Sequence, residues 1–355
     1  MITEWPLRWQ AAITRARWVG GFQAWFGTDD DCLDYLEWMR WPHGFICPGC
    51  AHEGGWRLGD GRFWCPGCGR RTSVTAGTIF DRTRTPLTVW FTACWMFATQ
   101  KDGVSALSLQ RALEIGSLQT AWAMLHRLRS VLVRPGRDRL SGTVEVDETF
   151  IGGEEAGLPG RSRGKKTLTA IAVEVREPKG IGRCRMAILR DATATSLLPF
   201  VIDHVEPGAR VITDGWQGYA GLDDHGYVRE RRSQRIAQAR GEDPVLPAVH
   251  RVASLAKRWL LSTHQGSFDQ AHLPSYLNEF VFRFNRRHSR SRGLVFYRVL
   301  ELAIGHGPVR YRDLIKHPRP RPSQRPPSRN RGRPPSLERP AADRPWRPAG
   351  LASSG

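Results

Sequence analysis

The sequence contains no run of 18 apolar residues, so no helix long enough to cross a membrane is expected. Its first residues lack a charged start followed by an apolar core, so no secretory signal is expected either. Cysteine is scarce: there are seven, and four of them form two close pairs. That spacing argues against a disulfide framework and favours a reducing cytoplasm, with Cys32, Cys94 and Cys184 as packed thiols. No repeat of 20 to 50 residues is visible.

Acidic residues are too few to balance the basic ones: 34 Asp and Glu stand against 53 Lys and Arg, a net charge of +19. A field of this sign attracts polyanions, and nucleic acid is the obvious partner, although a merely soluble basic protein is the alternative. Residues 317–355 hold nine Arg, ten Pro and two acids, which leaves +12 on the rest of the chain. This composition predicts a disordered tail that either binds DNA weakly or is only solvated.

The first 135 residues divide into three segments by pattern. Residues 1–40 are predicted to be a helical segment, with a helix over 28–40 that Thr28 or Asp29 caps. Residues 41–85 are rich in Gly, Cys and Trp and have little helical pattern. Residues 86–135 are predicted to be helical, with helices over 86–101, 104–114 and 117–133.

A short Gly-containing turn at 115–117 joins the last two of these helices, which is helix-turn-helix spacing. The second helix carries a polar face that includes His126, Arg127 and Arg129. A DNA-binding pair of helices is one interpretation; two packed helices with a basic rim is the other.

The hydrophobic period changes after Gly136. Strands are predicted over 143–150, 168–175, 185–189 and 209–213, with a helix over 195–205. A further helical region follows from about 250 to 305, interrupted at 264–270. Residues 140–310 are therefore predicted to form an α/β unit within an α+β multidomain chain.

Two Cys-x-x-Cys knuckles, separated by 14 residues, predict a metal site. Four thiolates at this spacing suit one tetrahedral zinc ion, and a closed site of this kind is structural rather than catalytic. The predicted ligands are Cys47, Cys50, Cys65 and Cys68.

Two aspartates interrupt predicted strands. Asp147 lies within the apolar alternation of Val144–Phe150, and Asp214 ends the apolar strand Val211–Thr213. A carboxylate in a buried strand is costly unless it is paired or bound to a metal. If the strands are neighbours, the two carboxylates form a site for Mg²⁺ or Mn²⁺, ions that activate a hydroxyl and stabilise a leaving oxygen at phosphorus. Taken singly, each aspartate also fits a capping or turn role.

Four motifs resemble those of one family of bacterial insertion-sequence transposases, the zinc-ribbon, DDE-type (ISXO2-like) family. They are Asp147-Glu148-Thr149-Phe150-Ile151-Gly152-Gly153, Thr213-Asp214-Gly215-Trp216, the block from His250 to Gly266, and the block from Tyr276 to Arg287. The resemblance runs from about residue 25 to 305. It implies a ribonuclease-H-like core and a nucleoid-associated enzyme that cuts DNA and transfers strands, with Asp147 and Asp214 holding the catalytic metals. It also implies a homodimer or higher assembly on DNA, with element terminal inverted repeats and target DNA as partners.

The third metal ligand departs from the family pattern, in which it is a Glu or, in a subgroup, an Asn. His250 is the first candidate, because imidazole binds Mn²⁺ and it lies seven residues before Lys257, on about the same helical face. Glu279 is the second candidate, and a packing role for His250 is the alternative. Lys257 is predicted to contact a phosphate near the scissile bond.

Basic residues outside the metal site are predicted to contact the DNA backbone, with a solvated helix face as the alternative. They are Arg127, Arg129, Arg258, Arg283, Arg286 and Arg287. The weighed alternative for the whole chain is a decayed or domesticated transposase that binds DNA without cutting it.

Overall fold

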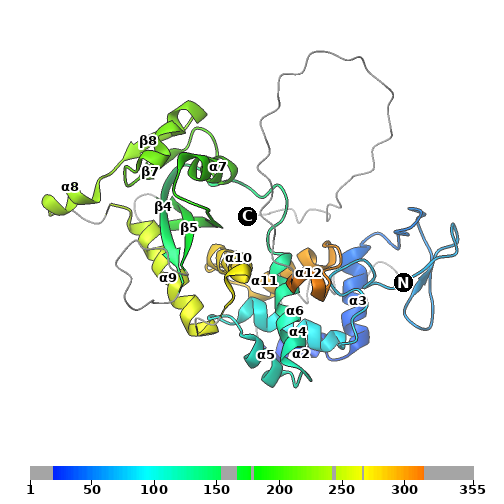
Figure 1. Ribbon diagram of the computed structural model, residues 1–355. Helices are drawn as coiled ribbons and strands as arrows, with labels where there is room; N and C mark the ends of the chain where they lie inside the picture. Colours follow the sequence, from blue (N-terminus) through cyan, green and yellow to red (C-terminus); the bar gives the residue numbers. More distant parts are fainter. Residues whose placement is uncertain (1–18, 153–165, 177–179, 242–244, 266–267, 316–355) are drawn as a thin grey trace, which may run out of the picture.

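A computed structural model describes residues 19–152, 166–176, 180–241, 245–265 and 268–315. Part of the predicted N-terminal helical segment, residues 1–18, and the predicted tail at 317–355 lie outside these ranges. Figure 1 shows two groups of elements, a helical group and a sheet with its covering helices, with α10 between them. None of the described helices is long and apolar enough to span a membrane.

The helical group, named here the helical module, begins with α2 (Val19–Trp25), α3 (Asp29–Arg40), α4 (Leu87–Thr99), α5 (Ala106–Ala112) and α6 (Leu118–Ser130). The predicted start of α3 is confirmed: Thr28 caps it in a capping box with Asp31. The side chains of Ser105 and Ser117 accept from the N–H groups of Ser108 and Thr120 and so cap α5 and α6, and the predicted turn between these helices is also present.

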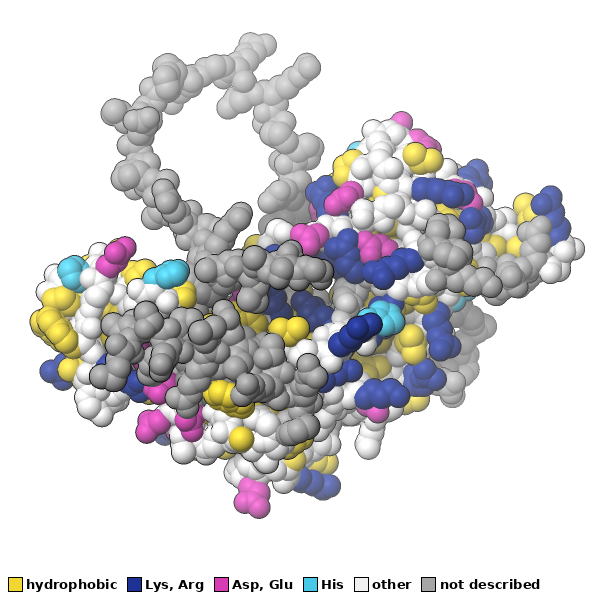
Figure 2. Space-filling view, turned by 180° about the vertical axis from the view of Figure 1, so that it is seen from behind, with side chains coloured by type: hydrophobic (Ala, Val, Ile, Leu, Met, Phe, Trp, Pro, Cys, Tyr) yellow, Lys and Arg dark blue, Asp and Glu magenta, His cyan; other side chains and the backbone are white. Residues whose placement is uncertain are grey.

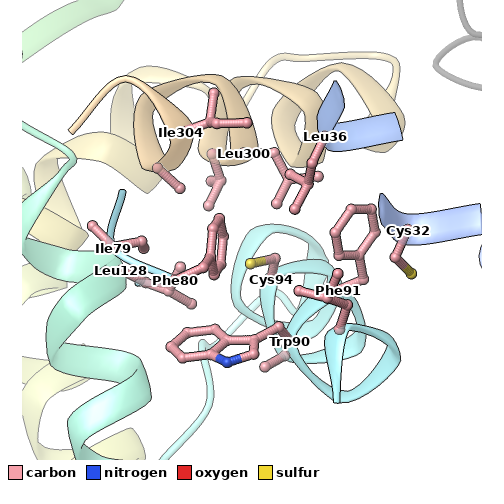
Figure 3. Close-up of a cluster of buried hydrophobic side chains, with 14 of the residues drawn as sticks. Cys32, Leu36, Ile79, Phe80, Trp90, Phe91, Cys94, Leu128, Leu300 and Ile304 are labelled. Atoms are coloured by element: carbon pink, nitrogen blue, oxygen red, sulfur yellow. The ribbon is translucent and has the colours of Figure 1, made fainter. Parts of the chain in front are cut away.

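The core of the helical module includes α11 (Arg292–Ile304), which comes from the far end of the chain. Figure 3 shows its Leu300 and Ile304 facing Phe80, Phe91 and Cys94 across a tightly filled interior. The sequence predicted that residues 140–310 form one α/β unit, whereas α11, which lies within this range, packs with the N-terminal helices. The short α12 (Tyr311–Ile315) follows it.

The segment predicted to bind zinc forms a small antiparallel sheet. Its strands are β1 (Trp56–Arg57), β2 (Phe63–Trp64) and β3 (Arg71–Thr72), in the order β1-β2-β3. Trp56 stacks on Trp64 with ring centroids 4.9 Å apart, and Trp56 remains 58% exposed.

The second group, named here the sheet module, has a five-stranded mixed sheet in the order β6-β5-β4-β7-β8. The strands β4 (Thr143–Ile151), β5 (Thr167–Val175) and β6 (Ile181–Ile188) pair antiparallel, whereas β7 (Arg210–Thr213) and β8 (Val228–Arg231) run parallel to β4. The strand β8 was not predicted from the sequence, and β6 begins earlier than predicted.

Helices cover both faces of the sheet (Figure 1). On one face, α7 (Ala194–His204) and the 3₁₀ segment η1 (Gln217–His225) pack on even-numbered residues of β4 and β5. On the other, α9 (Pro247–His264) and α10 (Leu273–Asn285) pack on odd-numbered residues. The period of two along a strand thus separates two cores. The short elements α8 (Gln234–Ala239) and η2 (Gln270–His272) connect these parts.

A buried cluster of charges joins the helical module to the sheet module. The Nε of Arg129 on α6 donates to Glu279 on α10 at 2.7 Å, and the Nε of Arg283 donates to the same carboxylate at 2.8 Å. Glu279 has no exposed side-chain surface, and the side chain of Arg129 is 1% exposed. The two guanidinium groups hold the pKa of Glu279 below its ordinary value even though burial alone would raise it.

This cluster corrects two predictions. Glu279 is not available as a metal ligand, because both of its oxygens accept from arginines. Arg129 does not lie on a polar outer face, because it crosses the interface between the modules. Gly103, at φ +80, covers the cluster; a Cβ there would lie 3.2 Å from Trp259 Nε1 and 3.4 Å from a Glu279 oxygen.

We predict that Glu279→Ala lowers the free energy of unfolding by about 3–5 kcal/mol, because it leaves Arg129 buried without a counter-charge. Urea unfolding of the intact chain measures this change. The control is Glu206→Ala, at an exposed acid, which should stay within about 0.5 kcal/mol of the parent. A loss below about 1 kcal/mol would mean that the cluster does not stabilise the interface.

Candidate functional site

Three polar residues alternate along β4 on the face that α9 covers: Glu145, Asp147 and Thr149. Each contacts α9. The carboxylate of Glu145 accepts from the backbone N–H of Val249 at 2.9 Å, Asp147 Oδ2 lies 3.4 Å from His250 Nε2, and Thr149 Oγ1 accepts from Lys257 Nζ at 2.8 Å. One strand and one helix therefore align the polar groups of the site in a row.

Glu145 is the buried end of this row, with 3% exposure, and it lies at the first turn of α9. Four N–H groups at a helix start have no partner within the helix, and a carboxylate there also complements the helix dipole. Burial raises the pKa of Glu145, whereas the N–H groups of Val249 and Ala248 act against that shift. Glu145 thus fixes where α9 begins, and with it the position of His250.

Asp147 is the carboxylate at the centre of the row. Its Oδ1 accepts from the backbone N–H of Glu148 at 2.9 Å, and its side chain is 19% exposed. The pKa of Asp147 is raised to about 6: burial is the largest cause, the neighbouring carboxylates Asp214 and Glu145 add to it, and the Glu148 N–H opposes the shift. The site therefore disfavours a free negative charge at this position and favours a cation beside it.

Asp214 directly follows β7, the parallel neighbour of β4. The parallel register of β4 and β7 pairs Thr143 with Arg210 and Glu145 with Ile212. Extended by two residues, this register would bring Asp214 beside Asp147, and the charge of Asp214 contributes to the raised pKa of Asp147. Gly215, at φ +94, turns the chain away directly after it, and Asp214 Oδ1 accepts from the N–H of Trp216 at 2.9 Å. The middle of β4 and the end of β7 thus bring two carboxylates near one another.

His250 and Lys257 lie on one side of α9, as predicted from their spacing of seven residues. His250 is half exposed, so its ring is open to solvent as well as to Asp147. Burial lowers the pKa of Lys257, and the nearby Lys166 lowers it further. Sequence reasoning missed Glu145 and Thr149, although the alternation Glu145, Asp147, Thr149 was sufficient to place all three on one strand face.

The opposite face of β4 holds a second carboxylate, Glu148. Its oxygen accepts from the hydroxyl of Tyr219 at 2.8 Å, and Tyr219 is fully buried in η1. Burial and the Glu148 charge raise the pKa of Tyr219, so the phenol remains a donor. This bond ties the segment that follows Asp214 to the residue that follows Asp147.

The four predicted zinc ligands come together. Cys47 Sγ lies 3.6 Å from Cys68 Sγ, and Cys50 Sγ lies 3.5 Å from Cys65 Sγ. Sulfurs around a tetrahedral zinc with bonds of about 2.3 Å lie about 3.8 Å apart, so the set fits this ion and supports a structural zinc. Within the described ranges, it is the one group of three or more possible ligands whose atoms all lie within 4.8 Å of one another. Asp147, Asp214 and His250 form a wider set.

Most of the predicted DNA-binding arginines bind the protein itself. Arg127 donates to the carbonyl of Val309 at 2.9 Å, and Arg283 donates to that of Gln100 at 2.7 Å besides Glu279. Arg287 donates to the carbonyls of Gly182 and Phe284 at 3.1 and 2.8 Å. Like Arg129, these three guanidinium groups hold the fold together rather than present a free basic face. Arg258 is exposed, and Arg286 lines a cavity that is described below.

Two family models match the chain. A transposase zinc-ribbon domain matches residues 27–74, and an ISXO2-like transposase domain matches residues 139–285. The chain is also similar to a protein of Halobacterium salinarum described as an uncharacterized protein in transposable element ISH50. The two are 28% identical over 274 residues, which cover 73% of this chain and 91% of the relative. The cysteine cluster and the row along β4 and α9 fall within the matched domains.

We predict that Asp147→Asn stabilises the metal-free fold at neutral pH. A carboxyl whose pKa is raised from 3.8 to about 6 on folding costs the folded state free energy once it ionises. The gain should be on the order of 2–3 kcal/mol above pH 6 and should shrink as the pH falls from about 6 to about 4. Urea unfolding in the presence of a chelator at several pH values measures it; a variant less stable than the parent at pH 7.5 would contradict this account of Asp147.

Proposed function

Because the chain belongs to the ISXO2-like transposase family with its zinc ribbon, we propose that it binds the ends of an insertion sequence and catalyses metal-dependent DNA cleavage and strand transfer. The observation that carries this proposal is that Asp214, directly after the strand parallel to β4, is near enough for its charge to raise the pKa of Asp147, with His250 Nε2 3.4 Å from Asp147. The mixed sheet with helices on both faces is consistent with the ribonuclease-H-like core that the family implies.

The donor set of this site fits a hard divalent cation. Asp147 and Asp214 offer carboxylate oxygens, and the raised pKa of Asp147 indicates that this carboxylate lacks a strong counter-charge of its own. Mg²⁺ retains several waters and does not require a closed cage, which agrees with the wide spacing of the group. When bound, Mg²⁺ or Mn²⁺ would activate the attacking hydroxyl and stabilise the leaving oxygen.

The other groups of the row have roles that follow from their positions. His250 would complete the ligand set or take a proton from a water at the site, since its ring is half exposed and directed at Asp147. Lys257, held by Thr149, presents a positive charge about two helical turns further along the same face. It would position a phosphate of the scissile strand. Glu145 would orient His250 without contacting substrate.

Basic side chains surround this part of the molecule. Figure 2 shows Lys and Arg gathered over the sheet module. Arg231, Arg251, Lys257 and Arg258 are all exposed, and Arg231 lies on the edge strand β8 beside Asp214. Such a surface attracts DNA through its phosphates and makes the affinity depend on salt.

The helices α5 and α6 remain candidates for recognition of the element ends. His126 and Arg129 are buried in α6, so this helix can offer DNA only its first turns, where Leu118 and Gln119 are exposed. In a helix-turn-helix, these N-terminal residues of the second helix are the ones that contact base edges. The geometry therefore supports this interpretation, with fewer residues than the sequence suggested.

We predict that Asp147→Ala and Asp214→Ala each reduce DNA cleavage at least about a hundredfold while the affinity for DNA stays within a few-fold of the parent. The carboxylates hold metal, whereas affinity comes from Lys and Arg elsewhere. Cleavage of a donor with matched element ends in Mg²⁺, together with a binding assay, measures both effects. The matched control is Asp203→Ala, at an exposed aspartate of α7. Near-parental cleavage by either site variant would refute the assignment.

A second prediction concerns the third ligand. His250→Ala should impair cleavage, whereas His250→Glu, which places a hard carboxylate at the same point, should keep or raise the activity in Mg²⁺. Cleavage rates of each variant are measured in Mg²⁺ and in Mn²⁺. Substitution of a metal ligand should change the ratio of the two rates, whereas substitution of a packing residue should not. Full activity of His250→Ala in both metals would leave two aspartates and water as the ligands. A parent chain inactive in both metals would favour the decayed transposase instead.

A further inference from the structure

A cavity of about 300 Å³ lies between the helical module and the sheet module, away from the row along β4 and α9. Its walls come from the linker after α6, from the edge strand β6, and from α10 and α11. One acid, Asp138, and six arginines line it: Arg134, Arg137, Arg183, Arg185, Arg286 and Arg298. We name it the arginine pocket.

Three of these arginines are paired with carboxylates. Arg183 lies 2.6 Å from Glu174, Arg298 contacts Glu301, and Arg134 lies 3.3 Å from Asp138 in a pair that is largely exposed. The other three, Arg137, Arg185 and Arg286, form no ion pair with any residue that the structure describes. The pocket therefore carries positive charge that the described part of the protein does not neutralise.

Two of the three unpaired guanidinium groups, those of Arg185 and Arg286, are held in place by contacts with the protein. Arg185 is 5% exposed and donates to the carbonyls of Cys184 and Asp138, at 3.0 and 2.5 Å. Arg286 lies over the ring of Phe282 at 3.9 Å from its centroid. Burial and the neighbouring arginines lower the pKa of Arg185 and of Arg286 to about 10, so both remain charged at neutral pH.

We propose that the arginine pocket binds a phosphate group of the DNA backbone. Guanidinium forks match phosphate oxygens in paired hydrogen bonds, and the three arginines of the pocket that form no ion pair leave positive charge that such an anion would neutralise. The pocket contacts both modules at once, so a phosphate held there would fix their relative position on the duplex. The choice of DNA over a free phosphate rests on the proposed function.

The first test uses the intact chain and pyrophosphate as the probe. Pyrophosphate should raise the Tm of the parent, compared with chloride at equal ionic strength, because a ligand of the folded state alone stabilises it. Arg137→Gln and Arg286→Gln should lose most of this rise. Arg312→Gln, which removes the same charge from an exposed site on α12, should keep it.

The same variants separate binding from a structural role. Arg137 donates no hydrogen bond to any described group, so Arg137→Gln should leave the Tm without phosphate unchanged or higher, as expected where like charges repel. If Arg137→Gln and Arg286→Gln instead respond to pyrophosphate as Arg312→Gln does, the pocket is not a phosphate site.

The second test identifies the source of the phosphate. The affinity for a duplex of arbitrary sequence is measured over a range of salt concentrations. For each DNA phosphate that a variant no longer neutralises, the slope of log K against log salt should be smaller by about 0.9. Arg137→Gln and Arg286→Gln should show this decrease, and Arg312→Gln should not.

Two outcomes separate the pocket from the proposed function. A parental slope in variants that no longer respond to pyrophosphate would assign the pocket to a free phosphate and overturn the DNA assignment. If the parent binds no duplex, the DNA binding that the proposed function requires is refuted. The pyrophosphate test still decides whether the pocket binds phosphate.

Discussion

The alignment of β4 with α9 is the constraint on which the candidate site depends. From Glu145 to Thr149 a strand advances about 13 Å, and from Val249 to Lys257 a helix advances about 12 Å. Because these lengths nearly match, one strand and one helix that run in the same direction meet at three successive points, each with a polar contact. A shift of one residue in the strand would turn the carboxylates towards α7, and a shift in the helix start would move His250 from Asp147. The cap by Glu145 opposes both changes.

The surroundings of a guanidinium group decide what an arginine of this chain does, and three cases show the range. Where an acid is buried beside them, as Glu279 is beside Arg129 and Arg283, they join elements. Where solvent surrounds them, as for Arg251 and Arg258, they contribute to a general field around the molecule. Where they are buried and form no ion pair with a described residue, as Arg185 is, they remain charged, and an anion from outside the described protein can neutralise them. The net charge of the chain alone does not distinguish these cases.

The sequence predicted the elements whose signals are local. Caps, hydrophobic periods and knuckle spacing gave α3, α4, α6, β4, β5, α7 and the cysteine cluster, and the strand that precedes Asp214 is a neighbour of the strand that carries Asp147. The errors concern partners that are distant in the chain. Arg129 and Glu279 lie 150 residues apart, and no local pattern distinguishes a buried arginine on a helix from an exposed one. The edge strand β8, whose four residues include three charged ones, lacks the apolar alternation by which strands are recognised.

The contact between Arg129 and Glu279 has a consequence for the ancestry of such chains. Its two halves belong to the helical module and to the sheet module, and they lie 150 residues apart in the sequence. A hybrid that inherits one half without the other contains an isolated buried charge, which is among the most destabilising arrangements in a folded protein. An exchange of the helical module with that of a related chain therefore keeps the fold stable only where both halves of this contact are retained or replaced together.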